Sequence, residues 1–220
     1  EIKGCSSKKD LPEAKRAFGY WSRCQDSGRS DYLERKQVGA YGVRFREGDQ
    51  GIIVVVPMQD AKGFIWNHQK IYLDGTKQFH KGRTRGLFHL LKTLSPTGPI
   101  AICEGYATSA TIFELTNLPT VCAFFAGNIP HVVQELISIQ TGNSYLLFCD
   151  NDRHLPNNIG LTKAEEARAI APDSIHVVAP FFDDIPDGKD ASDWNDLVRL
   201  RGREFAQNQI RQKIASQSKE

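Results

Sequence analysis

The second half of the chain alternates short apolar segments with helical ones, and this rhythm restricts the fold more than any other feature. Apolar runs predict strands at 100–103, 120–124, 145–149 and 174–178, and helical patterns follow at 108–116, 129–139, 161–171 and 194–215. Strands that alternate with helices predict a parallel sheet with helices on its faces. In open sheets of this type the functional residues lie just beyond the carboxyl ends of the strands.

Acidic residues stand at those strand ends. Glu104 follows the first strand, where Gly105 allows a sharp turn, and Asp150 and Asp152 follow the third. Residues two apart in an extended segment point the same way, so the two aspartates face one site. Clustered carboxylates repel each other unless a divalent cation offsets their charge, and hard oxygen ligands suit Mg²⁺ or Mn²⁺. The sequence therefore predicts a metal site formed by Glu104, Asp150 and Asp152.

The segment after the fourth predicted strand is also rich in acids. Asp187 and Asp190 fall on the same strand-end side as the other three, and we expect them to bind a second or transient metal ion. Asp193 and Asp196 open the last helix. We interpret them as a helix cap and a complement to the helix dipole, because acids near a helix start are stabilising without any metal.

The first half of the chain has a different pattern. A helix is expected at 11–24 and a short one near 31–36, and strands are expected at 41–46, 51–57 and 64–73 with Gly-containing turns between them. This part is therefore expected to be α+β with an antiparallel sheet. A Pro- and Gly-rich patch at 95–99 separates the halves, so the predicted regions are 1–97, 98–200 and a C-terminal helix end and tail at 201–220.

Charge is distributed unevenly between these regions. Residues 1–97 hold 18 Lys and Arg against 10 Asp and Glu, a balance of +8, and the remainder has a balance of −6. A basic half joined to an acidic half is expected if one part holds a polyanion and the other holds cations. Two solvated faces of differing charge would give the same count.

Basic residues cluster around two glycines at the end of the first half, and a smaller pair lies on an earlier strand. The candidate nucleotide- or nucleic-acid-binding residues are Lys77, Lys81, Arg83 and Arg85, followed by Arg44 and Arg46. A solvated charged loop is an equally good interpretation of any one of them. Nearby aromatic residues could stack on bases, but in an antiparallel sheet such residues usually belong to the core.

The cysteines and the apolar runs exclude some classes of protein. The five cysteines form no C-x-x-C pair and three lie at or near the ends of predicted strands, so they are expected to be buried thiols rather than zinc ligands. No apolar run approaches the roughly 18 residues of a membrane span, and the first residues have no apolar signal core. We therefore expect a cytoplasmic fragment of a longer protein, with no membrane partner.

Glu-Gly at one strand end, Asp-x-Asp at another and Asp-Gly-x-Asp after a fourth resemble the TOPRIM domain of primases, topoisomerases and certain nucleases, over about 99–200. Within that group, the segments Glu104–Ile112, Ala123–Asn128 and Cys149–Asp152, with Gly160 and Ala164, are most similar to the primases of conjugative plasmids and some phages. Tyr32–Lys36, Val56–Pro57 and Asp74–Gly75 are similar to the segment that precedes TOPRIM in those primases.

The resemblance implies a DNA primase catalytic core, which is a nucleotidyltransferase of DNA replication. It implies an α+β subdomain followed by an α/β TOPRIM domain with a four-stranded parallel sheet. It also implies Mg²⁺- or Mn²⁺-dependent joining of ribonucleoside triphosphates on a single-stranded DNA template, with a replicative helicase as a further partner. Glu104 would then bind metal or position the attacking hydroxyl.

Two functions in other classes remain open at this point. The same acids could serve a TOPRIM nuclease or another phosphoryl transferase, and a non-catalytic nucleic-acid-binding module could keep a metal site for structure. Thr108 stands where many bacterial primases have an acid, which leaves one metal-ligand role without a candidate. The zinc-binding module that precedes many such primases is not part of this sequence.

Overall fold

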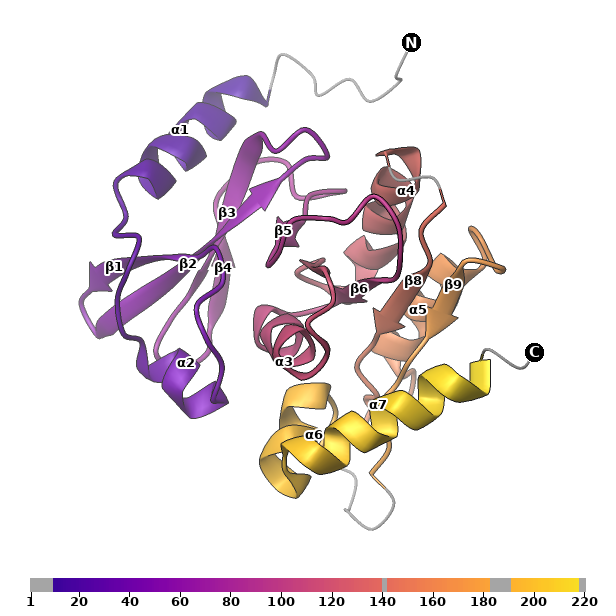
Figure 1. Ribbon diagram of the computed structural model, residues 1–220. Helices are drawn as coiled ribbons and strands as arrows, with labels where there is room; N and C mark the ends of the chain where they lie inside the picture. Colours follow the sequence, from indigo (N-terminus) through magenta and orange to yellow (C-terminus); the bar gives the residue numbers. More distant parts are fainter. Residues whose placement is uncertain (1–9, 140–141, 183–190, 218–220) are drawn as a thin grey trace. The chain divides into compact units, whose positions relative to one another are not determined.

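An antiparallel sheet and a mostly parallel sheet are the centres of two units of the chain, residues 1–89 and 90–220 (Figure 1). The computed structural model describes residues 10–139, 142–182 and 191–217. The expected regions 1–97, 98–200 and 201–220 were assigned by function, and the structural units do not test them. That division therefore stays a prediction.

The first unit is a four-stranded antiparallel sheet in the order β1-β2-β3-β4 with two helices. Its elements are α1 (Leu11–Ser22), α2 (Asp31–Lys36), β1 (Arg44–Gly48), β2 (Gly51–Gln59), β3 (Ile65–Ile71) and β4 (Lys77–Phe79). The β-branched run of β2 favours a central strand, and Gly51 adopts φ +123° at the β1–β2 turn. Pro12 lies in the first turn of α1, and Ala14 and Ala17 are its buried residues.

The second unit is a five-stranded sheet in the order β5-β7-β6-β8-β9, flanked by helices. Its elements are β5 (His89–Leu90), β6 (Ile100–Cys103), α3 (Tyr106–Thr116), β7 (Thr120–Cys122), η1 (Ala126–Asn128), α4 (Ile129–Ile139), β8 (Tyr145–Phe148), α5 (Ile159–Arg168), β9 (Ile175–Val177), α6 (Trp194–Arg201) and α7 (Arg203–Gln217). The strands β7, β6, β8 and β9 are mutually parallel, which confirms the expected fold class. The two-residue strand β5 is an addition that the sequence did not predict.

Alternate residues of β6 and β8 face opposite layers of helices. Ala101, Cys103, Leu146 and Phe148 belong to a core that also contains residues of α3, α6 and α7. Trp194, at the start of α6, packs edge-on against Phe148 with ring centroids 5.8 Å apart. The intervening strand residues are also buried, and α4 and α5 pack together as the other helical pair. Both faces of the sheet are thus covered, as parallel sheets require.

Two expected elements end earlier than the sequence pattern indicates. The predicted helix 194–215 is two helices, because Gly202 has φ +86° and separates α6 from α7. The predicted strand 120–124 stops at Cys122, and Phe124 adopts φ +73°, which is rare for a bulky side chain. No helix in the described ranges combines the length and hydropathy that a membrane span requires.

Candidate active site

The carboxyl ends of β6 and β8 bring Glu104 and Asp150 to one edge of the second sheet. Cys103 lies beside Phe148 in parallel register, so Glu104 and Cys149 are the first residues beyond the two strands and Asp150 is the next. Neighbouring strands are about 4.8 Å apart. Asp152 follows within the same short segment, and all three carboxylate residues are partly exposed.

The electrostatics of two buried cysteines show that negative charge gathers at this edge. Burial, followed by the charge of Asp150, raises the pKa of the Cys149 thiol to about 12, and Glu165 and Glu104 act in the same direction. Burial and the neighbouring Cys122 raise the pKa of Cys103 well above its ordinary value, with Asp150 and Asp193 contributing. Both thiols therefore stay protonated, and Asp150 acts on both.

The donor set at this edge fits a hard divalent cation. Glu104, Asp150 and Asp152 offer partly exposed carboxylate oxygens, which are the hard ligands that suit Mg²⁺ or Mn²⁺. Among the described residues, no three His, Cys, Asp or Glu side chains are already grouped closely enough to hold a metal ion. Asp187 and Asp190 lie outside the described residues.

The helix after Asp152 packs tightly on the backbone of Asp150. A Cβ atom added at Gly160, in the first turn of α5, would lie 2.6 Å from the carbonyl oxygen of Asp150. Only glycine fits at that distance, because real Cβ atoms do not approach backbone oxygens so closely. Gly160 thus lets α5 begin directly against the aspartate segment.

Asp193 and Asp196 have the structural role expected from the sequence. Asp193 is the N-cap of α6 and accepts a hydrogen bond from Asp196 N at 2.7 Å, and the Asp196 side chain completes a reciprocal capping box. Asp196 is buried and also contacts Arg199. Thr108, which stands where many bacterial primases have an acid, is a buried residue of α3 and offers no carboxylate.

The first unit places its basic candidates on two faces of its sheet. Arg44 is paired with Val55, which is paired with Lys70, so these three side chains share one face. Lys77 is paired with Ile71, the residue after Lys70, and therefore lies on the other face. This separation was not predictable from the sequence, because it depends on the pairing register of the strands.

The basic residues on the sheet face that includes Arg44 and Lys70 lie over aromatic rings of α1. The guanidinium of Arg46 and the ammonium of Lys70 each lie 4.5 Å from the centre of the Tyr20 ring. Arg44 lies 4.7 Å from the Trp21 ring and donates to the Trp21 carbonyl oxygen. Arg46 is exposed, so its charge remains available to a ligand.

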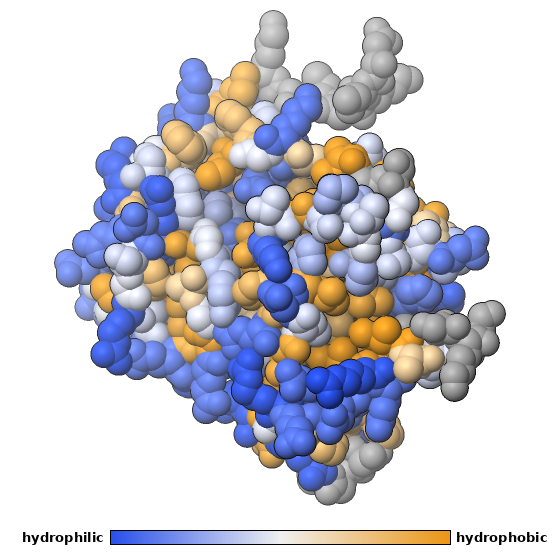
Figure 2. Space-filling model, in the orientation of Figure 1, coloured by the Kyte–Doolittle hydropathy of each residue, from blue (hydrophilic) through white to orange (hydrophobic). Residues whose placement is uncertain are grey.

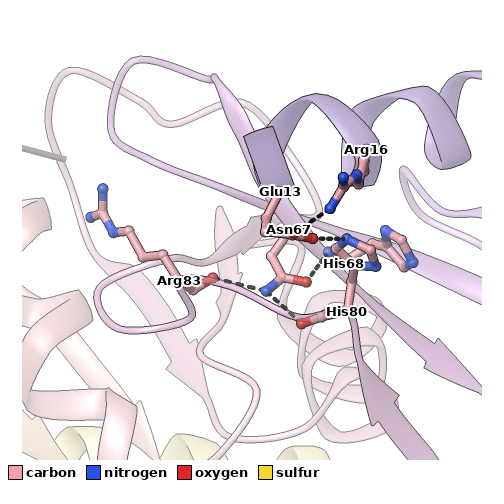
Figure 3. Close-up of polar contacts among 6 residues, drawn as sticks. All are labelled: Glu13, Arg16, Asn67, His68, His80 and Arg83. Carbon is pink, nitrogen blue, oxygen red and sulfur yellow. Dashed lines mark hydrogen bonds and ion pairs between the residues drawn. The ribbon is translucent and has the colours of Figure 1, made fainter. Parts of the chain in front are cut away.

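The loop after β4 is held by a buried asparagine (Figure 3). Asn67 Nδ2 donates to the carbonyl oxygens of His80 and Arg83, at 3.0 and 2.9 Å, and Asn67 Oδ1 accepts from His68 N. The His80 ring also lies 3.2 Å from a Glu13 carboxylate oxygen. The loop that carries Lys81, Arg83 and Arg85 therefore has a fixed backbone, and Lys81 and Arg85 are exposed on it.

Two aromatic residues and one histidine near the basic candidates belong to the core or to structural contacts. Trp66 and Phe88 are buried, as expected for aromatic residues of a sheet. His89 is buried with Nε2 2.8 Å from the Tyr41 carbonyl oxygen, and burial lowers its pKa to about 4. Four described cysteines are free and buried, as the sequence predicted.

A cavity of about 520 Å³ lies in the second unit at the opposite edge of the sheet from the acids. Pro99 and Ser144, which line it, precede β6 and β8, and Ile210 and Ile214 line it from α7. Figure 2 shows hydrophobic residues gathered along one side of α7, beside hydrophilic residues on its outer side. This cavity is not part of the candidate active site.

The arrangement of an antiparallel unit followed by a parallel-sheet unit is the fold of DNA primase catalytic domains. The chain aligns with the primase fragment of the bacteriophage T7 primase-helicase with a TM-score of 0.60 and 19% identity, over 90% of this chain and 77% of that one. A DnaG primase catalytic domain bound to single-stranded DNA gives a TM-score of 0.61 at 14% identity, over 94% and 80%. A DNA primase domain from Pseudomonas aeruginosa gives 0.60 at 15%, over 92% and 79%.

Sequence comparison relates the chain to particular primases within that class. It is 36% identical over 146 residues, 62% of its length, to the DNA primase TraC of Escherichia coli, and it matches a second TraC protein of that species equally well. The chain spans 10% and 14% of the lengths of these relatives. No family model matches the sequence.

Proposed function

We propose that this chain is the catalytic core of a DNA primase that joins ribonucleotides on a single-stranded DNA template with Mg²⁺ or Mn²⁺. The observation that carries the proposal is the parallel register of β6 and β8, which sets Glu104 beside the Asp150–Asp152 segment. The relationship to TraC primases and the primase fold support it.

In this proposal the carboxylates of Asp150 and Asp152 hold the metal, and Glu104 either joins them or positions the attacking 3′-hydroxyl. A bound divalent ion would lower the barrier by making the hydroxyl more acidic and by neutralising triphosphate charge. Asp187 and Asp190 are proposed to bind a second or transient ion. The buried thiols of Cys103 and Cys149 stay protonated, so they add no negative charge to that of the acids at this edge.

The basic residues of the first unit are proposed to hold the phosphates of template and nucleotide. The loop fixed by Asn67 presents Lys81, Arg83 and Arg85, and a loop with a fixed backbone loses little conformational freedom when a phosphate binds. Lys77, Arg44 and Arg46 are proposed to extend this role. Their separation onto two faces suggests that each face contacts a different stretch of phosphate.

The test is an assay of the purified chain with labelled ribonucleoside triphosphates, single-stranded DNA and Mg²⁺ or Mn²⁺. We expect template-dependent RNA products that disappear when metal is chelated. Degradation of the template in place of synthesis would identify a nuclease instead. DNA binding without either reaction would identify a binding module and contradict the proposed activity. A replicative helicase, a partner expected from the resemblance, is then tested by whether it stimulates synthesis.

A further inference from the structure

The backbone between Asp150 and Asp152 is held by two asparagine side chains. Asn158, the N-cap of α5, has φ 33° and ψ 66°, a left-handed conformation that asparagine tolerates better than most residues. Its Oδ1 accepts from Asp152 N at 3.1 Å, and its Nδ2 donates to Asn151 Oδ1 at 2.8 Å. One side chain thus binds both residues that follow Asp150.

Asn151, the central residue of the Asp-Asn-Asp motif, extends the network in the other direction. Its Nδ2 donates to the Pro180 carbonyl oxygen at 2.9 Å, and its backbone N donates to the Ser192 carbonyl oxygen at 2.7 Å. Ser192 is itself held by the capping box of α6, because its N donates to Asp196 Oδ2. The segment after β8 is therefore tied to α5, to the residues after β9 and to the start of α6.

The distances argue against a simple helix cap at Asn158. A cap needs only the bond from a first-turn N–H, and here that bond, from Leu161 N, is 3.5 Å long. The bonds to Asp152 N and Asn151 Oδ1 are shorter. The side chain is therefore oriented by the aspartate segment more than by the helix.

We infer that Asn151 and Asn158 are positioning residues of the metal site, which hold the backbone of the Asp150–Asp152 segment in one conformation before any cation arrives. The inference rests on the proposed function, since it assumes that these aspartates bind metal. Two like charges in one short segment repel, and a flexible segment would let them separate. The amide pair restrains the backbone of the segment without adding charge. Residues that orient metal ligands commonly change metal affinity about 10- to 100-fold when they are removed.

The test uses Asn151→Ala, Asn158→Gly and the double variant. Glycine keeps the left-handed backbone at 158 and removes only the side chain, so it separates the hydrogen bonds from the conformation. Asn157→Gly is the matched control, because Asn157 is the exposed neighbour one residue earlier. Melting temperatures without metal identify any variant that fails to fold, and Asn158→Gly, the milder change, keeps the test informative if Asn151→Ala does not.

The first readout is Mn²⁺ binding, followed by the electron paramagnetic resonance signal of the free ion. We expect the dissociation constant for Mn²⁺ to rise about tenfold or more in each single variant and to stay unchanged in the control. The double variant should be little worse than the singles, because both residues act through one network. Mn²⁺ affinity equal to that of the control in both single variants would overturn the inference.

The second readout is the Mg²⁺ dependence of primer synthesis. The variants should need about tenfold more Mg²⁺ for half-maximal rate and should recover most of the parent rate at saturating metal. A rate loss that metal does not restore would contradict a positioning role. Failure of the proposed metal site and failure of the positioning role give different results. A parent chain that binds no Mn²⁺ refutes the metal assignment itself. A parent that binds Mn²⁺ while the variants match the control refutes only this inference.

Discussion

The two units position their candidate functional residues by different means. In the second unit, neighbouring parallel strands end at one edge, so the chain order puts the segments that carry Glu104, Asp150 and Asp152 at that edge. In the first unit, the basic residues lie on both faces of an antiparallel sheet and on the loop after β4, and their places depend on register and on a buried amide. The position of the proposed acidic site therefore follows from the strand topology, and the position of the proposed basic surface follows from particular contacts.

The largest effect should follow from removing a carboxylate at the parallel edge. Glu104→Gln keeps the shape of the side chain and removes its charge, so we expect primer synthesis to fall at least about 100-fold, because bound metal supplies several kcal/mol of barrier reduction. Glu204→Gln, an exposed change on α7, is the control. Synthesis rates are measured at the same metal concentration for all chains. A Glu104→Gln rate equal to that of the control would contradict the assignment.

The corresponding change in the first unit removes the amide that fixes the basic loop. Asn67→Ala loses three hydrogen bonds from a fully buried side chain, and we expect the free energy of unfolding to fall by about 2 kcal/mol. Affinity for single-stranded DNA should fall as well, because the loop backbone is released. Gln50→Ala, an exposed amide of the same unit, should change neither quantity. Chemical denaturation and DNA titration would show whether the loop depends on Asn67.

The stability of the chain should also be sensitive to a single methyl group added at Gly160, where the packing is close. Gly160→Ala places a Cβ 2.6 Å from the Asp150 carbonyl oxygen, so the segment or α5 must shift, at about 1–3 kcal/mol. Gly19→Ala, whose added Cβ would meet nothing nearer than 3.7 Å on α1, should be neutral or stabilising. A normal melting temperature and normal Mn²⁺ affinity for Gly160→Ala would contradict the close contact.

Acid should destabilise the folded chain through the buried side chain of His89. The folded pKa of His89 is about 4 and its ordinary value is 6.5, so the unfolded chain binds more protons between these values and stability falls as the pH drops from 6.5 towards 4. His89→Gln removes the titrating group, so at pH 5 the variant should lose about 2 kcal/mol less unfolding free energy than the parent. Unfolding free energies at pH 7 and pH 5 measure it. Equal pH dependence in parent and variant would refute the histidine contribution.

The smallest effect concerns single phosphate contacts. Lys81→Ala should lower the slope of log affinity against log salt for single-stranded DNA by about 0.7, because one fewer counterion is released. Lys62→Ala, an exposed lysine of the β2–β3 turn, serves as the control. Equal slopes for the two variants would place the DNA away from the loop after β4.

Sequence patterns predicted the second unit better than the first for a physical reason. Buried parallel strands are nearly continuous apolar runs, and an acid directly after such a run, such as Asp150, is conspicuous. Asn158 and Asn151 carried no comparable signal, since asparagine is common in turns and its partners are remote in sequence. Asn67 and the opposite faces of Lys70 and Lys77 depend on strand register, which a single sequence specifies weakly. The positive φ of Phe124 was also not predictable, because the residues next to it in the sequence form no turn motif that indicates this conformation.

The central claim is that the acids at the end of β8 exist to hold a cation, and one paired measurement tests it most directly. Asp150→Asn and Asp152→Asn are compared with Asp173→Asn, an exposed aspartate before β9 at the opposite edge of the sheet. For each chain, the melting temperature without metal and primer synthesis with Mg²⁺ or Mn²⁺ are measured together. We predict that the first two variants lose synthesis and melt at or slightly above the parent temperature, because the repulsion between the two carboxylates is removed, while Asp173→Asn keeps full activity. Full synthesis by both Asp150→Asn and Asp152→Asn would contradict the account.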